Sequence, residues 1–260
     1  MEPLLQGKVA IVYGAGGGIG RGVAATFARE GARVFLAGRT GARLEAVAAD
    51  IHAAGGQADV ALVDTLDEDA VAEHARAVAD LAGSLDVSFN LTSRGDVQGL
   101  PLVDMTLADF LQPITTGVTT TFITARAAAR IMAGQGSGVI LSLTSGSSRG
   151  TAPMMGGTGP ADAATEVFLR SLAAEVGTQG VRVVSLWTAG VPETFGLPDD
   201  TNEARRASGL GAADIERMLG PRTMLGHAPR LAQVADTAAF LASDRAGGIT
   251  GTLVNVTCGL

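Results

Sequence analysis

The sequence predicts a doubly wound α/β fold, in which a parallel β-sheet carries helices on both faces. Short apolar runs rich in β-branched residues alternate with longer, alanine-rich stretches of helical spacing. The short runs are apolar throughout, as expected for parallel strands that are buried on both faces. A glycine-rich loop separates the first apolar run from the first helical stretch, which is typical of an α/β domain that binds a nucleotide.

Taken in order along the chain, the apolar runs define the strands and the alanine-rich stretches define the helices. We expect strands at residues 9–13, 33–37, 60–63, 87–90, 138–143, 181–187 and 252–256. We expect helices at residues 19–30, 42–54, 67–82, 107–132, 161–176 and 231–242, the first of them ended by Gly31. Residues 188–226 show no readable pattern, and no linker or repeat divides the chain. We therefore predict one domain over residues 1–260, with a substrate-facing segment near residues 188–227.

Composition excludes several classes of protein. Hydrophobic residues make up 47% of the 260 residues, which is enough to bury a sizeable core. The net charge of −7 disfavours nucleic acids and anionic membranes as partners, because both favour a basic surface. The lone cysteine, Cys258, excludes an intrachain disulfide, and no apolar run reaches the roughly 18 residues of a membrane span. Residues 1–8 do not resemble a signal peptide, so we expect a cytoplasmic protein with a small-molecule substrate and no metal site.

The glycine loop is the first candidate binding site. Gly14, Gly18 and Gly20 follow the first strand with the spacing Gly-x-x-x-Gly-x-Gly and lead into the first helix. Glycines allow a sharp turn and close approach of a pyrophosphate, and the helix N-terminus offers free N–H groups. We expect Gly14, Gly18, Ile19 and Gly20 to bind a dinucleotide; the alternative is a tight turn without a ligand.

Residues at the ends of the second and third strands bear on the choice of cofactor. Dinucleotide folds usually place an acid after the second strand to bind the adenosine ribose, or an arginine where the ribose carries a 2′-phosphate. Here Arg39 stands at this place and no acid does, which favours NADP(H) over NAD(H). The alternative is a solvated arginine. Asp64, which follows the third strand, is a candidate partner of the adenine amino group or a helix cap.

With these motifs, the chain resembles the short-chain dehydrogenase/reductase family over nearly its whole length. The matching segments are the glycine loop, residues 84–90 ending at Asn90, residues 169–175, the turn at Ala189 and Gly190 with Thr194 after it, and residues 240–244 and 249–251. The resemblance implies a Rossmann-type domain of about seven parallel strands and hydride transfer between a nicotinamide cofactor and a carbonyl or alcohol. It also implies that Asn90, Gly190 and Thr194 lie at the cofactor, and that two long helices form a homodimer or homotetramer.

The resemblance breaks down at the catalytic residues. The family uses a tyrosine as the acid, a lysine four residues later that lowers the tyrosine pKa, a serine that orients the carbonyl, and an asparagine in a proton relay. The segment 169–175 aligns these four positions with Thr158, Asp162, Ser145 and Gly117, respectively, so only the serine is retained. Residues 146–186 contain neither tyrosine nor lysine. Tyr13, the one tyrosine, follows the first strand and is expected to pack the glycine loop.

The substitutions leave several functions open. Thr158 is a far weaker acid than a phenol, and the charge of Asp162 would raise a neighbouring pKa instead of lowering it. Each of these residues, and Ser145, has an equally simple structural interpretation as a helix-start or turn residue. We therefore expect an NADP(H)-dependent oxidoreductase with Ser145, Thr158 and Asp162 at an unusual active site. The alternatives are an inactive NADP(H)- or ligand-binding regulatory protein, or a lyase or isomerase on the same scaffold. A pair of arginines after the fourth and fifth strands, Arg94 and Arg149, suggests an anionic substrate.

Overall fold

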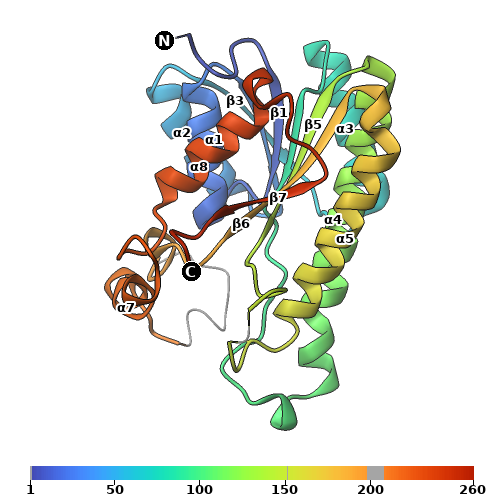
Figure 1. The fold of residues 1–260 in the computed structure, drawn as a ribbon. Helices are drawn as coiled ribbons and strands as arrows, with labels where there is room; N and C mark the ends of the chain where they lie inside the picture. The colour runs from blue at the N-terminus through green and yellow to red at the C-terminus, as the bar shows by residue number, and fades with distance from the viewer. Residues whose placement is uncertain (1, 151, 198–207) are drawn as a thin grey trace.

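A seven-stranded parallel sheet forms the centre of the molecule. The structure, a computed structural model, describes residues 2–150, 152–197 and 208–260. The strands lie in the order β3-β2-β1-β4-β5-β6-β7, so the chain winds outward from β1 in both directions (Figure 1). The strands are β1 (Val9–Tyr13), β2 (Arg33–Gly38), β3 (Gln57–Leu62), β4 (Val87–Asn90), β5 (Gly138–Thr144), β6 (Val181–Thr188) and β7 (Thr252–Val256). The predicted doubly wound sheet is confirmed.

Helices cover the two faces of this sheet. α1 (Gly18–Arg29), α2 (Gly41–Ala53) and α8 (Leu231–Ala242) lie on one face, while α3 (Glu68–Ala82), α4 (Leu107–Gln135) and α5 (Thr158–Val176) lie on the other (Figure 1). α7 (Ala212–Leu219) stands apart, near the carboxyl ends of the strands. The crossovers from β1 to β2 to β3 thus place α1 and α2 on one face, and the connections from β3 to β4, β5 and β6 place α3, α4 and α5 on the other.

Two hydrophobic clusters fill the space between the layers. One lies under α1, α2 and α8 and includes Phe27, Phe89 and Leu186, all fully buried. The other lies under α3, α4 and α5 and includes Ile11, Tyr13 and Met132. Alternate residues of β1 enter opposite clusters, since successive strand side chains point to opposite faces. This explains why the strand is apolar throughout.

The differences from the predicted element boundaries occur where local signals are weak. β3 begins three residues earlier than expected, at Gln57, because Asp59 on this edge strand is paired with Arg33 of β2. α5 begins at Thr158 and not at residue 161, because a proline is tolerated in the first turn of a helix. α7 lies within the segment that showed no pattern, and residues 198–207 of that segment lie outside the described residues.

The carboxyl ends of all seven strands lie at one edge of the sheet, at the bottom of Figure 1. Tyr13, Asn90, Thr144 and Thr188 end four neighbouring strands there. Ligands of open α/β sheets bind at this edge, where the strand order reverses between β1 and β4. Among the described residues, no helix is both long enough and apolar enough to span a membrane.

Candidate active site

The glycine loop between β1 and α1 is a tight turn in which side chains do not fit. Gly14 has a φ of +75°, and a Cβ atom there would lie 2.5 Å from the carbonyl oxygen of Leu91. A Cβ on Gly20 would collide with the carbonyl oxygen of Gly14. The helix begins after Gly17 with no side-chain cap and no acid in its first turn. Its first N–H groups and positive dipole end are therefore available to an anion, which fits the pyrophosphate of a dinucleotide.

A second segment packs against this loop. The short 3₁₀ helix Pro192–Thr194 follows β6, and a Cβ on Gly18 would lie 2.7 Å from the Cβ of Thr194. Thr194 is buried and donates its hydroxyl hydrogen to the carbonyl oxygen of Val191, 2.8 Å away. Gly190 faces Leu219 of α7. Gly18 and Thr194, which are 176 residues apart in the sequence, are thus brought together, as the resemblance implied.

The residues at the ends of β2, β3 and β4 have different surroundings. Arg39 is exposed at the end of β2, and Arg43 lies in the first turn of α2 with its side chain against Gly16. The sequence reasoning missed Arg43, although its spacing of four residues from Arg39 was available as a signal. Asp64 is exposed and caps a turn through the N–H of Leu66. Asn90 is buried.

The Asn90 side chain is already used within the fold. Its amide nitrogen donates to the hydroxyls of Thr120 and Thr121 on α4, at 3.4 and 3.3 Å, respectively. Its side-chain oxygen accepts from the N–H of Thr92 at 3.1 Å. Asn90 therefore anchors the β4 end to α4, and any contact with a ligand is in addition to this anchoring.

The carboxylate of Asp162 is the centre of the site. Its side chain is completely buried, and one oxygen accepts hydrogen bonds from the Ser145 N–H, the Ser147 N–H and the Ser145 hydroxyl, at 3.1, 3.1 and 2.7 Å, respectively. The other oxygen forms an ion pair with Arg94. An acceptor of four N–H and O–H groups has the bonding pattern of an ionised carboxylate. The structure thus brings together Ser145 and Asp162, two of the three predicted catalytic residues.

The cation that pairs with Asp162, Arg94, comes from a different element. It follows β4 in the chain, and its side chain is 15% exposed. Burial lowers the pKa of its guanidinium, but the adjacent carboxylates of Asp96 and Asp162 outweigh this effect and raise the pKa above its ordinary value. Arg94 is therefore permanently charged. The sequence analysis named Arg94 only for its place after the fourth strand, and it gave no sign that Asp162 is buried and requires a cation.

Arg94 reaches Asp162 because position 117 is a glycine. A Cβ on Gly117 would lie 2.6 Å from the Cδ of Arg94 and 3.0 Å from its Cγ. The arginine stem thus fills the space beside α4 that a side chain at position 117 would need. Arg94, Gly117 and Asp162 therefore depend on one another: a larger side chain at position 117 would displace the cation that neutralises the carboxylate of Asp162.

Thr158 lies one turn before Asp162 on α5, also buried. Its hydroxyl donates to Asp96, 2.9 Å away, and accepts from the amide of Gln98, 3.1 Å away. Asp96 in turn lies 3.3 Å from the guanidinium of Arg94. Thr158 is therefore connected to the Asp162 cluster through Asp96, and its hydrogen is directed to a carboxylate.

The direction of these hydrogen bonds limits what Ser145 offers to a ligand. An ionised carboxylate only accepts, so the Ser145 hydroxyl is the donor to Asp162. Ser147 lies 3.0 Å from the same hydroxyl oxygen, close enough to exchange a hydrogen bond with it. Ser145 therefore presents lone pairs to its surroundings, and the guanidinium of Arg94 is the strong donor of the cluster.

Tyr13 is separated from this cluster and lies in the core on the α3 side. Its ring is 1% exposed and meets the ring of His74 edge-on, with centroids 6.1 Å apart. Burial raises the pKa of its phenol. The expectation that Tyr13 packs against the glycine loop is wrong, because its side chain lies with Ile11 in the cluster under α3, α4 and α5, whereas Ala15 of the loop lies in the other cluster.

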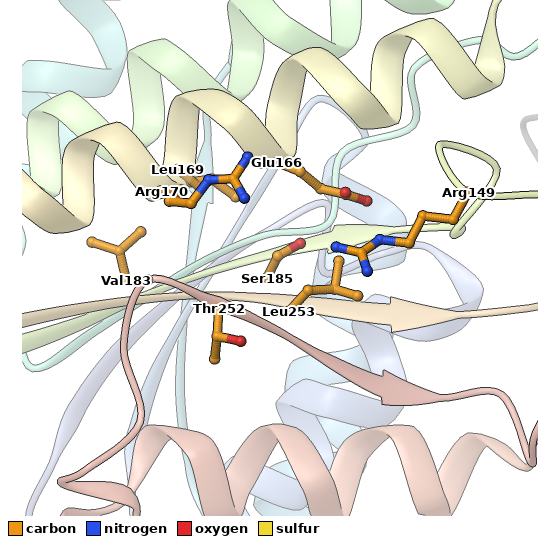
Figure 2. A pocket seen from close by; sticks show the side chains of 9 residues that line it. Arg149, Glu166, Leu169, Arg170, Val183, Ser185, Thr252 and Leu253 are labelled. Carbon is orange, nitrogen blue, oxygen red and sulfur yellow. The ribbon is translucent and has the colours of Figure 1, made fainter.

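Arg94 and Arg149, which were expected at one rim, lie at different sites. Arg94 pairs with Asp162, whereas Arg149 lines a cavity between α5 and the strands β6 and β7, which Arg94 does not line (Figure 2). The β5–α5 loop carries both Ser145 and Arg149, but Gly146 has a φ of +69° and the chain turns sharply there. Sequence position alone did not show this turn.

The glycine loop, the serine at the end of β5 and the doubly wound sheet together define a nucleotide-binding α/β oxidoreductase fold. The profile of the family described as enoyl-(acyl carrier protein) reductase matches residues 14–260, and the chain belongs to this family of short-chain dehydrogenases/reductases. Relatives include the 7α-hydroxysteroid dehydrogenase of Escherichia coli (strain K12), 28% identical over 98% of this chain and 94% of the relative. Another is the L-rhamnose 1-dehydrogenase (NAD(P)(+)) of Azotobacter vinelandii, 31% identical over 99% of this chain and 98% of the relative.

Solved structures give the same result. A 7α-hydroxysteroid dehydrogenase complexed with NADH and 7-oxo glycochenodeoxycholic acid has a TM-score of 0.86 and 27% identity, covering 99% of this chain and 96% of that one. The chain is thus a short-chain dehydrogenase/reductase, and its dehydrogenase relatives align over nearly its whole length.

Proposed function

We propose that this protein is an NADP(H)-dependent oxidoreductase acting on a carbonyl or alcohol substrate, with Arg94 in place of the family's tyrosine and lysine. The observation that supports this most directly is the buried Arg94–Asp162 pair, to which Ser145 is also hydrogen-bonded. It keeps a fixed cation and the retained serine in one cluster at the carboxyl edge of the sheet. Preorganised charge of this kind is usually the largest single contribution to catalysis.

The cofactor half of the proposal rests on the glycine loop and the end of β2. Gly14, Gly18 and Gly20 permit the tight turn into α1, whose uncapped N-terminus would face the pyrophosphate. Arg39 and Arg43 supply two cations for a 2′-phosphate, whereas an NAD(H) site would have an acid here. The remaining proposed cofactor contacts are Ile19, Asp64, Asn90, Gly190 and Thr194. Relatives differ in this respect: one was solved with NADH, and another is named for use of NAD(P)(+).

The chain's own residues have distinct proposed roles. The bound nicotinamide would supply or accept the hydride. Arg94 would donate hydrogen bonds to the substrate oxygen and stabilise the negative charge that develops there. Ser145, whose hydrogen is directed to Asp162, would accept a hydrogen bond from a substrate hydroxyl. Asp162 and Thr158 are then positioning residues, and water takes the tyrosine's place as the proton donor or acceptor.

A second candidate function is binding of NADP(H) without turnover, as in a regulatory protein. One observation favours it: Thr158 and Ser145 both direct their hydroxyl hydrogens to carboxylates, so neither is a free acid. The loss of general acid–base catalysis typically costs 10²–10⁴-fold in rate. The two candidates therefore share the cofactor and differ in whether a measurable rate remains.

Cofactor titration combined with a substrate screen separates the candidates. NADPH fluorescence should show saturable binding, tighter than for NADH, and Arg39→Asp should weaken NADPH binding at least tenfold while leaving NADH binding unchanged. Carbonyl substrates should then oxidise NADPH in the wild type, and Arg94→Met should lower kcat without weakening NADPH binding.

The outcomes of these measurements distinguish the two candidate functions from each other and from neither. Absence of binding to either cofactor would refute both candidates, and binding without turnover of any carbonyl or alcohol would favour the regulatory role. Turnover that is unchanged in Arg94→Met and in Ser145→Ala would refute the assigned site. The control is Arg130→Ala, an exposed arginine on α4, which should change neither quantity.

Other expectations remain predictions of this proposal. The segment near residues 188–227, which includes α7, would contact the substrate, and a small molecule is the expected ligand. A homodimer or homotetramer would form through α4 and α5, which pack together and leave Phe122 and Val167 exposed. A cytoplasmic location is likewise a prediction.

A further inference from the structure

A second concave site lies outside the Asp162 cluster. A cavity of about 180 Å³ opens between α5 and the strands β6 and β7. Its apolar floor includes Leu169 and Val183, which are 2% and 1% exposed, and its rim carries Arg149, Glu166 and Arg170 (Figure 2). The volume is below the roughly 300–1,000 Å³ of sites for drug-sized ligands, so only a small molecule fits.

The charges of this cavity are not neutralised within the fold. Arg149 and Arg170 are exposed, and neither side chain forms an ion pair or hydrogen bond with any part of the chain that the structure describes. In Figure 2 both guanidinium groups extend from opposite sides toward the space above Ser185. Two unpartnered guanidinium groups at one cavity favour a carboxylate, which accepts their N–H groups in a planar, bidentate manner.

The carboxylate of Glu166 favours a ligand that also carries a positively charged hydrogen-bond donor. One of its carboxylate oxygens accepts the hydroxyl of Ser148 at 2.9 Å, and the side chain lies between the two arginines along the rim. A dicarboxylate would be repelled by this charge. A ligand with a carboxylate at one end and an ammonium group at the other complements both signs, and a short hydrocarbon chain would cover Leu169, Val183 and Leu253.

The loop that carries Arg149 is fixed in place at two points on α5. Ser145 and Ser147 are bonded to Asp162, and Ser148 is bonded to Glu166, one helical turn further on. The backbone before Arg149 is therefore ordered without a ligand, which lowers the entropic cost of binding. From this arrangement we propose that the cavity is a binding site for a small aminocarboxylate, held by Arg149 and Arg170 at its carboxylate and by Glu166 at its ammonium group.

Calorimetric titration with 4-aminobutyrate tests this proposal directly. Butyrate, which lacks the ammonium group, and butylamine, which lacks the carboxylate, serve as matched probes. We expect 4-aminobutyrate to bind the wild type at least tenfold tighter than either probe. Arg149→Ala and Arg170→Ala should each weaken its binding about tenfold or more, and Glu166→Gln should abolish the preference over butyrate.

Two controls separate this site from the rest of the molecule. Arg130→Ala removes an exposed arginine of α4 that does not line the cavity, and Arg29→Met removes an exposed arginine of α1, so both should bind 4-aminobutyrate like the wild type. Added salt should weaken binding, since both arginines are exposed. Circular dichroism checks that each variant is folded, and Arg149→Lys, which keeps the charge, should retain part of the affinity.

Several outcomes would overturn the proposal. These are the absence of saturable binding of 4-aminobutyrate at millimolar concentration, equal binding of butyrate by the wild type, or wild-type affinity in Arg149→Ala and Arg170→Ala. Sedimentation of the variants gives a further check. If they lose the wild-type oligomeric state while the wild type binds no aminocarboxylate, the proposal is wrong and the arginines contact a second copy of this chain.

Discussion

Replacing Arg94 by methionine should destabilise the protein strongly, because it leaves the Asp162 carboxylate buried without its cation. Removal of one partner of a buried ion pair costs about 3–5 kcal/mol. Here Asp162 is completely buried, whereas Arg94 remains 15% exposed and the carboxylate keeps three other hydrogen bonds. We therefore expect the lower end, about 3 kcal/mol. For a chain of this size that corresponds to a fall in Tm of roughly 6–12 °C.

The measurement is urea unfolding of four proteins: wild type, Arg94→Met, Asp162→Asn and the double variant. The double variant has no uncompensated charge at position 162, so it should be more stable than the sum of the single changes predicts, by about 1–3 kcal/mol. Arg29→Met is the matched control. Its pair with Asp236 is 62% and 60% exposed, and its loss should cost under about 1 kcal/mol. A coupling energy near zero, or equal effects of Arg94→Met and Arg29→Met, would refute the structural role assigned to Arg94.

Three further predictions follow from other parts of the structure. Gly117→Ala should cost about 1–3 kcal/mol in urea unfolding despite the higher helix propensity of alanine, because its Cβ would displace Arg94; Gly134→Ala, where the space is open, should not destabilise. Gly20→Ala should weaken NADPH binding at least tenfold in a fluorescence titration, since its Cβ collides with the backbone of Gly14; unchanged affinity would contradict the assigned cofactor loop. Burial lowers the pKa of His74 from 6.5 to about 4, so the folded state binds this proton less readily than the unfolded state. The contribution of His74 to the free energy of unfolding should be fully present above about pH 6.5 and should fall by up to about 2–3 kcal/mol as the pH drops to about 4. His74→Gln should remove this part of the pH dependence, and an identical pH profile in the variant would refute it.

Much of the fold could be predicted from local sequence because the relevant signals are local. The strands β1 and β4 have the predicted bounds, since a continuous apolar run admits few alternatives in a sheet covered on both faces. The start of α5 and the helix α7 were harder to predict. Their limits depend on contacts with residues far along the chain, such as those of Gly157 with Phe110 and of Gly190 with Leu219.

The candidate site was only partly predictable. Ser145 and Asp162 were expected from the resemblance to the family, and the structure places them in direct contact. Arg94 was expected at a rim with Arg149 and lies instead beside Gly117, paired with a residue 68 positions away. No local pattern contains that information, because the pairing depends on how α5 packs on the sheet beside the loop that follows β4.

The sequence by itself determined the class of fold, the glycine loop and the absence of a tyrosine or lysine where the family has them, because each is a property of residue types and short spacings. It also placed Asp162 at the family's lysine position by resemblance, with a helix-start residue as the alternative. Only the tertiary structure decided how the charge of Asp162 is compensated: α5 buries the carboxylate, the loop after β4 brings Arg94 to it, and Gly117 leaves the space for the arginine to pass. A buried charge must be paired, and which residue pairs with it depends on three-dimensional proximity that the order of residues does not contain.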